Sequence, residues 1–442
     1  MKNRSELLIV ALIFTSILII ISWLPYRFSP AFARAKTSLE GPVINDTHLT
    51  AQLLVRGLKA PSAMSFLGPN DILVTEKNTG NLMRVVNGVI LQQPLLHVAA
   101  NKKDERGLLG LAISETENRR KHIFLYYTEA NLTESGKVSP VPLGNRVYRY
   151  EFVGDKLVNP KLLLDLPAFP GPRHNAGKIA IGLDNNLYVS IGDVDGSFRD
   201  TRSETKAQNY DVGPSPDGRA GILRITQDGK TVGKGILGDT PMLNYYYAYG
   251  IKNSFGFDFD PITKKLWDSE NGPTYGDEIN LVEPGFNSGW VKIQGIWKTQ
   301  IDSTAEPERG PVTGNSTLDL VNFGGKGKYR PPEFTWSSTV APTAVRFLTT
   351  DKLGQQYKND MFVADVKYGN IYHFKLNSNR TGFILNGSLA DKVASGEDNT
   401  EQIEFASGFG GITDLEIGPD GSLYVLVFDK EDGKIYKITP TG

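Results

Sequence analysis

The chain has 442 residues, of which 48 are basic and 49 acidic, and its formal net charge is −1. This balance gives no electrostatic support to nucleic-acid binding. The chain has no cysteine, which excludes disulfides, thiolate metal sites and cysteine nucleophiles. The 46 glycines, 18 tyrosines and 21 phenylalanines favour many short strands and turns over helices.

The N-terminal segment is expected to anchor or target the protein. Residues 7–24 are eighteen consecutive uncharged, mainly apolar residues that end at Pro25. A spanning helix needs about 17–25 apolar residues, whereas the apolar core of a signal peptide has about 7–15. The length therefore favours a transmembrane helix within residues 1–25. A cleaved signal peptide stays open, because residues 31–35 offer two small-x-small cleavage sites.

The body of the protein is expected to lie outside the cytoplasm, anchored to the membrane, or secreted if the N-terminal segment is cleaved. Five Asn-x-Ser/Thr tripeptides are compatible with this location, at Asn45, Asn131, Asn315, Asn379 and Asn386. Residues 26–50 are polar and lack periodicity, which predicts a stalk or linker.

From residue 51 onward one unit recurs six times: a short apolar strand, an Asn/Asp/Gly turn, a strand of the Leu-Tyr-Val type, a loop and a further strand. The units are recognised by strands at 71–75, 122–127, 187–191, 265–268, 360–364 and 421–426. Such repeats are typical of propeller blades. They predict an all-β, six-bladed β-propeller of four-stranded antiparallel blades over residues 51–442. Two stacked β-sandwiches stay possible, although they would not explain the repeat.

One of the five histidines, His174, lies on a Gly/Pro-bounded loop just before a predicted strand at 179–181. Asp193 follows nineteen residues later, at the far end of the next hairpin. Side by side, the carboxylate would orient one imidazole nitrogen and leave the other to accept a proton. The sequence thus suggests a catalytic base, while a surface turn at His174 and a plain turn at 192–196 stay possible.

Two further stretches carry candidate ligands. Residues 249–256 bring Lys252 and Asn253 to the start of the fourth unit, where a solvated loop is the simpler interpretation. Residues 269–278 contain a turn at Gly272 and Pro273 together with carboxylates. Carbonyl and carboxylate oxygens bind calcium, although acidic glycine turns are also common in β proteins.

In order and spacing, several stretches together resemble the soluble glucose/sorbosone dehydrogenases. These stretches are 105–112, 174–178, 192–193, 250–253, 270–273, 276–281, 284–290 and 339–342. The resemblance covers about residues 50–440. It implies a six-bladed propeller that oxidises an aldose with pyrroloquinoline quinone (PQQ) and calcium, and that passes electrons to an external acceptor.

The resemblance also implies roles for individual residues. His174 would take the proton of the anomeric hydroxyl while hydride passes to the quinone, and Asp193 would orient His174. The carbonyls of Gly272 and Pro273 would hold calcium, and Glu105 would lie on the substrate side. The residues expected to contact the cofactor are Lys252, Asn253, Thr339 and Lys367.

The chain departs from the family pattern where the cofactor should be gripped. Family members commonly have arginine at the position of Lys252 and two arginines where this chain has Gly411 and Thr413. PQQ carries three carboxylates, which arginine binds bidentately and lysine cannot. Lys178 and Lys367 are candidates to replace the missing cations.

This departure leaves other functions open. A propeller that lost the cofactor and binds carbohydrate or protein at the cell surface is the main alternative. A calcium-dependent propeller hydrolase such as a lactonase is a third.

Overall fold

The computed structural model describes residues 41–194, 204–300, 308–312, 317, 319–396 and 399–441. The predicted N-terminal helix and most of the predicted linker lie outside these ranges. Within them, no helix is both long and apolar enough to cross a membrane. The named helical elements are short 3-10 turns: η2 (Lys206–Gln208), η3 (Leu243–Tyr245), η5 (Gln355–Tyr357) and η6 (Gly387–Leu389).

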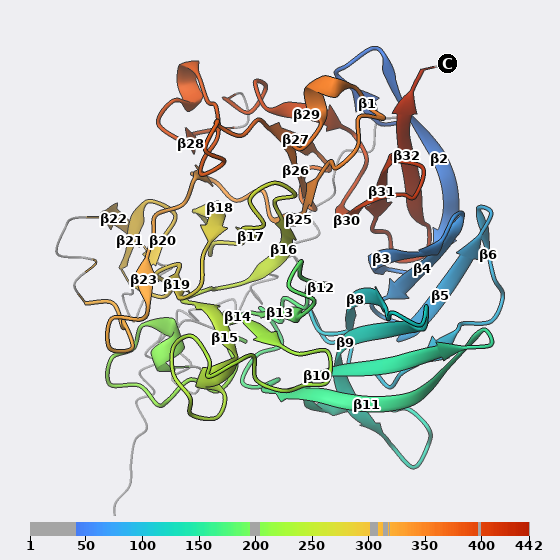
Figure 1. Cartoon of the computed structure of the whole chain (residues 1–442), viewed down its shortest axis with the longest axis horizontal. Coiled ribbons are helices and arrows are strands. Elements are labelled where there is room, and N and C mark those ends of the chain that lie inside the picture. The colour runs from blue at the N-terminus through green and yellow to red at the C-terminus, as the bar shows by residue number, and fades with distance from the viewer. Residues whose placement is uncertain are drawn as a thin grey trace, which may run out of the picture.

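The strands form six larger sheets, each named here after its innermost strand (Figure 1). The β3 sheet contains β3 (Pro61–Gly68), β4 (Asp71–Glu76), β5 (Asn81–Val86), β6 (Val89–Ile90) and β7 (Leu96–His97). The β8 sheet contains β8 (Leu108–Glu115), β9 (Lys121–Leu132), β10 (Val138–Val153) and β11 (Lys156–Leu166). The β12 sheet contains β12 (Ile179–Ile181), β13 (Leu187–Ile191), β14 (Gly221–Ile225), β15 (Tyr246–Tyr249), β19 (Phe286–Asn287) and β23 (Lys328–Tyr329).

The other three sheets come from the second half of the chain and its N-terminal strands. The β16 sheet contains β16 (Ser254–Phe259), β17 (Leu266–Glu270), β18 (Asp277–Val282), β24 (Phe334–Trp336) and β28 (Val393–Ala394). The β25 sheet contains β25 (Pro342–Phe347), β26 (Met361–Asp365), β27 (Ile371–Phe374), β29 (Glu404–Ser407) and β1 (Val43–Ile44). The β30 sheet contains β30 (Ile412–Ile417), β31 (Leu423–Val427), β32 (Gly433–Pro440) and β2 (Leu49–Leu58). A small seventh sheet contains β20 (Ile293–Gln294), β21 (Trp297–Gln300) and β22 (Glu308–Pro311).

The second strand of a sheet is buried on both faces, because a neighbouring sheet packs on each side. All five residues of β13 and all five of β31 are buried. Their sequences, LYVSI and LYVLV, are the continuous apolar runs that such a position requires. Turns of Asp, Asn and Gly precede them; Asn185, for example, has a φ of 61°.

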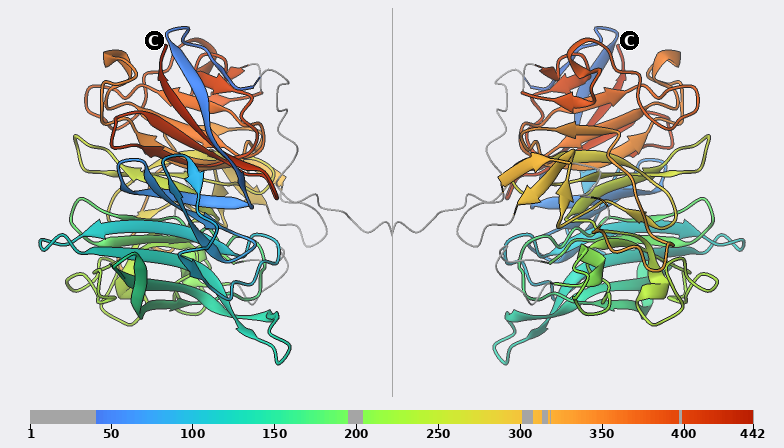
Figure 2. Two further views of the ribbon diagram at one scale, coloured as in Figure 1. Left: turned by 90° about the vertical axis from the view of Figure 1, so that its right-hand side faces the viewer. Right: turned by 90° about the vertical axis from the view of Figure 1, so that its left-hand side faces the viewer.

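The core is divided among the interfaces between sheets. Each pair of neighbouring sheets shares one cluster of buried apolar side chains, and the β30 sheet packs in turn on the β3 sheet. Antiparallel pairing of the N-terminal β2 with the C-terminal β32 completes the last sheet. The sheets therefore close into a ring, and the chain is an all-β β-propeller. The long strands β9, β10 and β11, in teal, extend beyond the body (Figure 2).

Two details differ from the prediction. Residues 43–44 and 49–50, assigned to the linker, pair with β29 and β32, so the propeller begins before residue 51. Four strands per sheet are found in the β8 and β30 sheets, but the other four contain five or six. Long loops add some of these edge strands, and β15–β19, β19–β23 and β24–β28 pair in parallel.

Candidate active site

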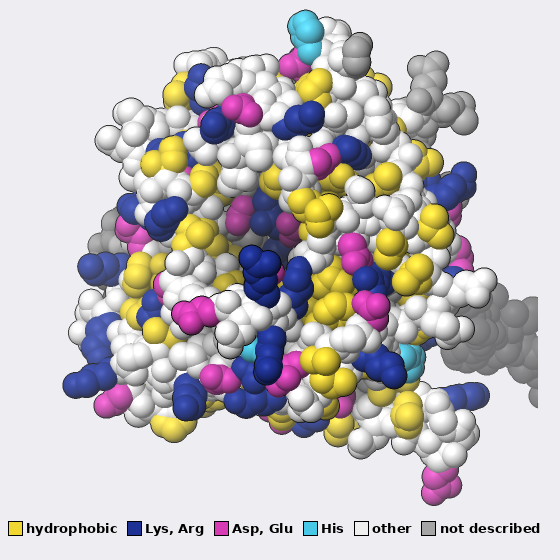
Figure 3. Space-filling view, turned by 45° about the vertical axis from the view of Figure 1, so that its right-hand side comes forward, with side chains coloured by type: hydrophobic (Ala, Val, Ile, Leu, Met, Phe, Trp, Pro, Cys, Tyr) yellow, Lys and Arg dark blue, Asp and Glu magenta, His cyan; other side chains and the backbone are white. Residues whose placement is uncertain are grey.

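The predicted site residues occupy equivalent places in different sheets. Glu105, His174, Lys252 and Thr339 precede the innermost strands β8, β12, β16 and β25, whereas other site residues lie in turns after second strands. In an antiparallel sheet the first strand starts and the second strand ends at the same end of the strand pair. Residues far apart in sequence therefore meet at one rim of the propeller. Figure 3 shows a hollow in one face of the molecule with basic and acidic side chains in and around it.

His174 and Asp193 form the pair that the sequence predicts. The Nδ1 atom of His174 lies 2.6 Å from Oδ1 of Asp193, and the indole N–H of Trp290 donates to Oδ2 of the same carboxylate at 2.8 Å. Asp193 and Trp290 are buried, while the His174 side chain keeps 16% of its surface exposed. A buried carboxylate thus orients an imidazole that still reaches solvent.

The loop that carries His174 packs closely against Gly192. Gly192 passes so close to it that a Cβ there would lie 2.4 Å from the carbonyl oxygen of His174 and 2.6 Å from that of Lys252. Only glycine permits this approach. His174 itself has a φ of 57°, the left-handed region, so the backbone is locally strained at this residue.

Lys252 contacts the other nitrogen of the imidazole. Its ammonium lies 3.1 Å from Nε2 of His174 and 5.7 Å from the centre of the Trp290 ring. Burial lowers the pKa of Lys252 below its usual range, and the nearby carboxylates of Asp193 and Glu105 oppose that shift. The geometry therefore joins Lys252 directly to the imidazole of His174, a contact that the sequence did not predict.

Glu105 holds the loops together. Its Oε2 accepts a hydrogen bond from the backbone N–H of His174 at 2.6 Å and from the side-chain amide of Asn253 at 3.2 Å. The Oδ1 of Asn253 in turn accepts from the backbone N–H of Ala176 at 3.1 Å. Glu105 and Asn253 thus position the loop of His174, and the substrate-side role of Glu105 stays a prediction.

The turn at Gly272 and Pro273 is fixed by Asp277, which sequence reasoning did not single out. One carboxylate oxygen of Asp277 accepts from the backbone N–H of Gly272, and the other accepts from those of Val340 and Ala341, each at 2.7 Å. No donor among the described residues bonds to the carbonyl of Gly272 or Pro273. The described residues also contain no cluster of three histidine or carboxylate side chains suited to a metal.

Lys367 and Thr339 meet beside this turn. The ammonium of Lys367 donates to the carbonyl oxygen of Thr339 at 2.6 Å and lies 4.8 Å from the centre of the Tyr368 ring. Thr339 directly precedes Val340, whose N–H bonds to Asp277. A chain of hydrogen bonds therefore connects Lys367 to the Gly272 turn.

Gly411 and Thr413, the positions where the resemblance implies arginines, contact other parts of the fold. The hydroxyl of Thr413 donates to the carbonyl oxygen of Pro61 at 3.2 Å, and a Cβ at Gly411 would lie 3.0 Å from Val366. Lys178, a candidate substitute, forms an ion pair of 2.9 Å with Asp414, and both side chains are largely buried. The charge of Lys178 is therefore balanced within the protein.

Three buried carboxylates lie behind the site: Asp268 and Glu270 on β17, and Glu278 on β18. Burial, with repulsion among the three, raises the pKa of Asp268 to about 8 and that of Glu270 well above its usual range. Burial raises the pKa of Glu278 to about 7. Glu270 accepts a hydrogen bond from the backbone N–H of Lys252 at 2.6 Å, so this acidic group is in direct contact with a site residue.

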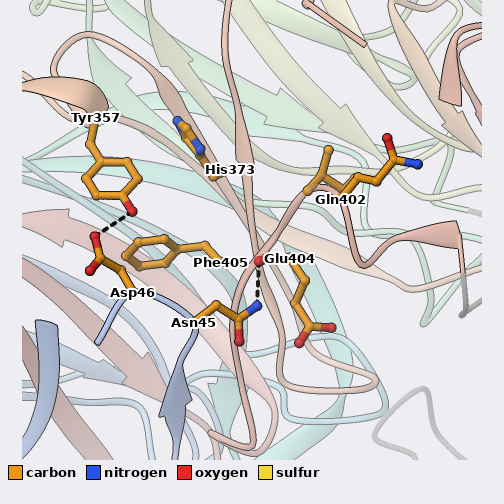
Figure 4. Close-up of a pocket in the computed structure, with 8 residues that line it drawn as sticks. Asn45, Asp46, Tyr357, His373, Gln402, Glu404 and Phe405 are labelled. Atoms are coloured by element: carbon orange, nitrogen blue, oxygen red, sulfur yellow. Dashed lines mark hydrogen bonds between the residues drawn. The ribbon is translucent and has the colours of Figure 1, made fainter. Parts of the chain in front are cut away.

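A cavity of about 340 Å³ lies elsewhere, at the outer edge where β1 joins β29 (Figure 4). Asp46 accepts from the hydroxyl of Tyr357 at 2.9 Å, and the amide of Asn45 donates to the carbonyl of Glu404 at 2.7 Å. The lining residues include none of the predicted site residues.

The fold is a β-propeller whose rim carries a His–Asp pair, and comparisons with known proteins show which proteins the chain resembles. Residues 58–437 match the model of the glucose/sorbosone dehydrogenase family, so the chain belongs to that family. It is 27% identical to quinoprotein glucose dehydrogenase B of Acinetobacter calcoaceticus over 347 residues, 72% of this chain and 67% of that one.

Two further comparisons extend this likeness. Aldose sugar dehydrogenase YliI of Escherichia coli strain K12 is 24% identical over 402 residues, 89% of this chain and 93% of that one. The fold matches a PQQ-bound aldose sugar dehydrogenase of Streptomyces coelicolor with a TM-score of 0.60 and 20% identity, covering 88% of this chain and 98% of the other.

Proposed function

We propose that the protein is a PQQ- and calcium-dependent dehydrogenase that oxidises an aldose sugar or a similar alcohol. The observation that carries the proposal is the imidazole of His174, which is held at Nδ1 by buried Asp193 and keeps 16% of its side-chain surface exposed. The same proposal takes the propeller as six-bladed, which is supported by the ring of six sheets.

His174 is the base in this proposal. A carboxylate only accepts hydrogen bonds, so Nδ1 carries the proton that bonds to Asp193 and Nε2 is the acceptor. The hydroxyl proton of the sugar passes to Nε2, and Asp193 stabilises the imidazolium that results. Trp290 fixes Asp193, while Glu105 fixes the loop of His174. When bound, PQQ supplies the acceptor for the hydride of the sugar carbon, and calcium polarises that acceptor.

The donor set on the rim fits these groups in part. The carbonyls of Gly272 and Pro273, which no described donor occupies, suit a hard cation. Lys252 and Lys367 are the lysines available to the cofactor's anionic groups, since Asp414 balances Lys178. We therefore expect PQQ to bind, but more weakly than a site with three arginines would bind it.

A cofactor-free propeller that binds carbohydrate or protein is the second candidate. The features that favour it are Gly411 and Thr413, neither of which offers a cation, and the pairing of Lys178 with Asp414.

We also propose that the enzyme acts outside the cytoplasm, anchored by residues 1–25, and that it reduces an external acceptor. The apolar run at 7–24 supports the anchor.

Dye reduction tests the function. The purified protein is given PQQ, calcium chloride and a panel of aldoses, and reduction of an artificial electron acceptor is followed with each component omitted in turn. The proposal expects activity that needs all three. Sugar binding to a protein that does not bind PQQ even at high concentration would favour the second candidate instead.

A further inference from the structure

We propose that Lys252 caps the base in the cofactor-free protein and must move to an oxygen of the bound cofactor before a sugar can be oxidised. The proposal rests on the proposed function and adds an order of binding to it, cofactor first and sugar second. It also makes Lys252 a positioning residue for His174 as well as a contact for the ligand.

The first step is the number of hydrogen bonds that the imidazole of His174 can make. A neutral histidine ring has one N–H donor and one acceptor nitrogen. Asp193 takes the donor at Nδ1, which leaves Nε2 as the acceptor. The ammonium of Lys252 lies 3.1 Å from this atom and fills that position. A sugar hydroxyl therefore cannot donate to Nε2 while Lys252 stays there.

The second step is that the Lys252 ammonium has fewer hydrogen-bond acceptors than donors. Its side chain carries three N–H donors, yet among the described residues His174 is the one hydrogen-bond acceptor of the ammonium. The residue is only 3% exposed, so water cannot freely satisfy the other two donors. A buried ammonium with unfilled donors points to an absent acceptor, such as the carboxylate or quinone oxygens of the cofactor.

The third step is that the backbone of Lys252 is fixed while its side chain can turn. The backbone N–H donates to Glu270 at 2.6 Å, and the backbone carbonyl accepts from the N–H of Asp193 at 2.9 Å. Movement is thus confined to the flexible lysine stem. The three donors of a lysine share one small ammonium, unlike the spread donors of an arginine fork. An anionic oxygen that draws the ammonium away from the imidazole would therefore release Nε2.

Acylation of His174 tests the cap without any cofactor. Diethyl pyrocarbonate acylates free imidazole nitrogens, and peptide mapping by mass spectrometry reports each histidine separately. In the cofactor-free protein, Lys252→Met should raise the acylation rate of His174 about tenfold, the factor for one charge-assisted hydrogen bond at the low end of its range. Lys252→Arg, which keeps donors, should not reach that rate.

His373, whose Nε2 lies 2.9 Å from Asp360, serves as the internal reference and should react equally in all these variants. Equal acylation of His174 in the unchanged protein and in Lys252→Met would overturn the cap.

The affinity for PQQ tests the release. If Lys252 must leave His174 to bind the cofactor, His174→Ala removes the competing acceptor and should tighten PQQ binding about tenfold in equilibrium dialysis with calcium. His373→Ala should not change it. A His174→Ala protein that binds PQQ no tighter than the unchanged protein would overturn the release. Failure of every variant to bind PQQ would instead refute the proposed function, and the acylation result would still decide whether the cap exists.

Discussion

The polar groups on the two sides of the rim have different hydrogen-bond partners. On the side of the base, His174, Asp193, Trp290 and Glu105 bond to one another at 2.6–2.8 Å. On the side of Gly411 and Thr413, the polar groups bond to the backbone of the fold or pair across it, as Lys178 does with Asp414. The comparison teaches that the His174–Asp193 pair is precisely held without a full set of cations beside it. Substitutions at Gly411 and Thr413 should therefore change cofactor affinity with little effect on the chemical step.

The largest effect is expected at the base. His174→Ala should lower the PQQ-dependent rate of aldose oxidation about 10²–10⁴-fold, since general base catalysis contributes that much. The matched control is His373→Ala, because His373 also pairs with an aspartate, Asp360, but lies outside the site. Steady-state dye reduction measures both. A comparable loss in the two variants would mean that the effect is structural.

A smaller effect on activity is expected from Asp277, which fixes the turn at Gly272 and Pro273. Asp277→Ala removes the acceptor that ties Gly272 to Val340 and Ala341. Outer residues of this kind change metal affinity about 10–100-fold, so the calcium needed for half-maximal activity should rise by a similar factor. Asp420→Asn, on a distant turn, is the control. An unchanged calcium requirement would show that Asp277 does not support a calcium site.

Adding a cation near Gly411 and Thr413 should increase the affinity for PQQ. Thr413→Arg is expected to tighten PQQ binding about tenfold, because it adds one charge-assisted contact, while leaving the turnover of the loaded protein nearly unchanged. Thr413→Gln matches the polarity without the charge and should bring no gain in affinity. Gly411→Arg should gain less, since its Cβ would crowd Val366. Equilibrium dialysis with PQQ separates these outcomes.

The smallest effect on activity is expected at Asp268, where the change appears in stability. Its pKa is about 8 in the folded protein against an ordinary value of 3.8, so the folded state holds a proton that the unfolded state releases between these pH values. Stability from this group is therefore lost as pH rises from about 4 to about 8.

Asp268→Asn should be most stabilising at pH 8, on the order of a few kcal/mol, because one pKa unit corresponds to about 1.4 kcal/mol. It should have little effect near pH 4. Thermal unfolding at both pH values provides the measurement, and an equal gain at the two would contradict the assigned pKa.

The repeats and the pairing of His174 with Asp193 were predictable because their signals are local. Runs such as LYVSI and LYVLV, each after an Asx or Gly turn, mark the buried second strands. His174 and Asp193 lie at the two ends of one hairpin, so their pairing follows from short-range geometry.

Other features depend on contacts that the sequence does not encode locally. Asp277 binds backbone N–H groups 63 and 64 residues away, which no side-chain pattern reveals. The pairing of Lys178 with Asp414 spans 236 residues and joins the residue before β12 to β30 of another sheet. Likewise, β2 pairs with β32 because the ring closes, so residues 49–50 belong to the propeller although their own sequence does not mark them as a strand.

A single turnover tests the central claim most directly. The protein is loaded with PQQ and calcium, freed of excess cofactor and mixed anaerobically with an aldose without an external acceptor, while the absorbance of the quinone is followed. The account predicts reduction of one quinone per protein in the unchanged chain and a reduction at least about a hundredfold slower in His174→Ala. Bound quinone that stays oxidised with every aldose and simple alcohol tested would contradict it.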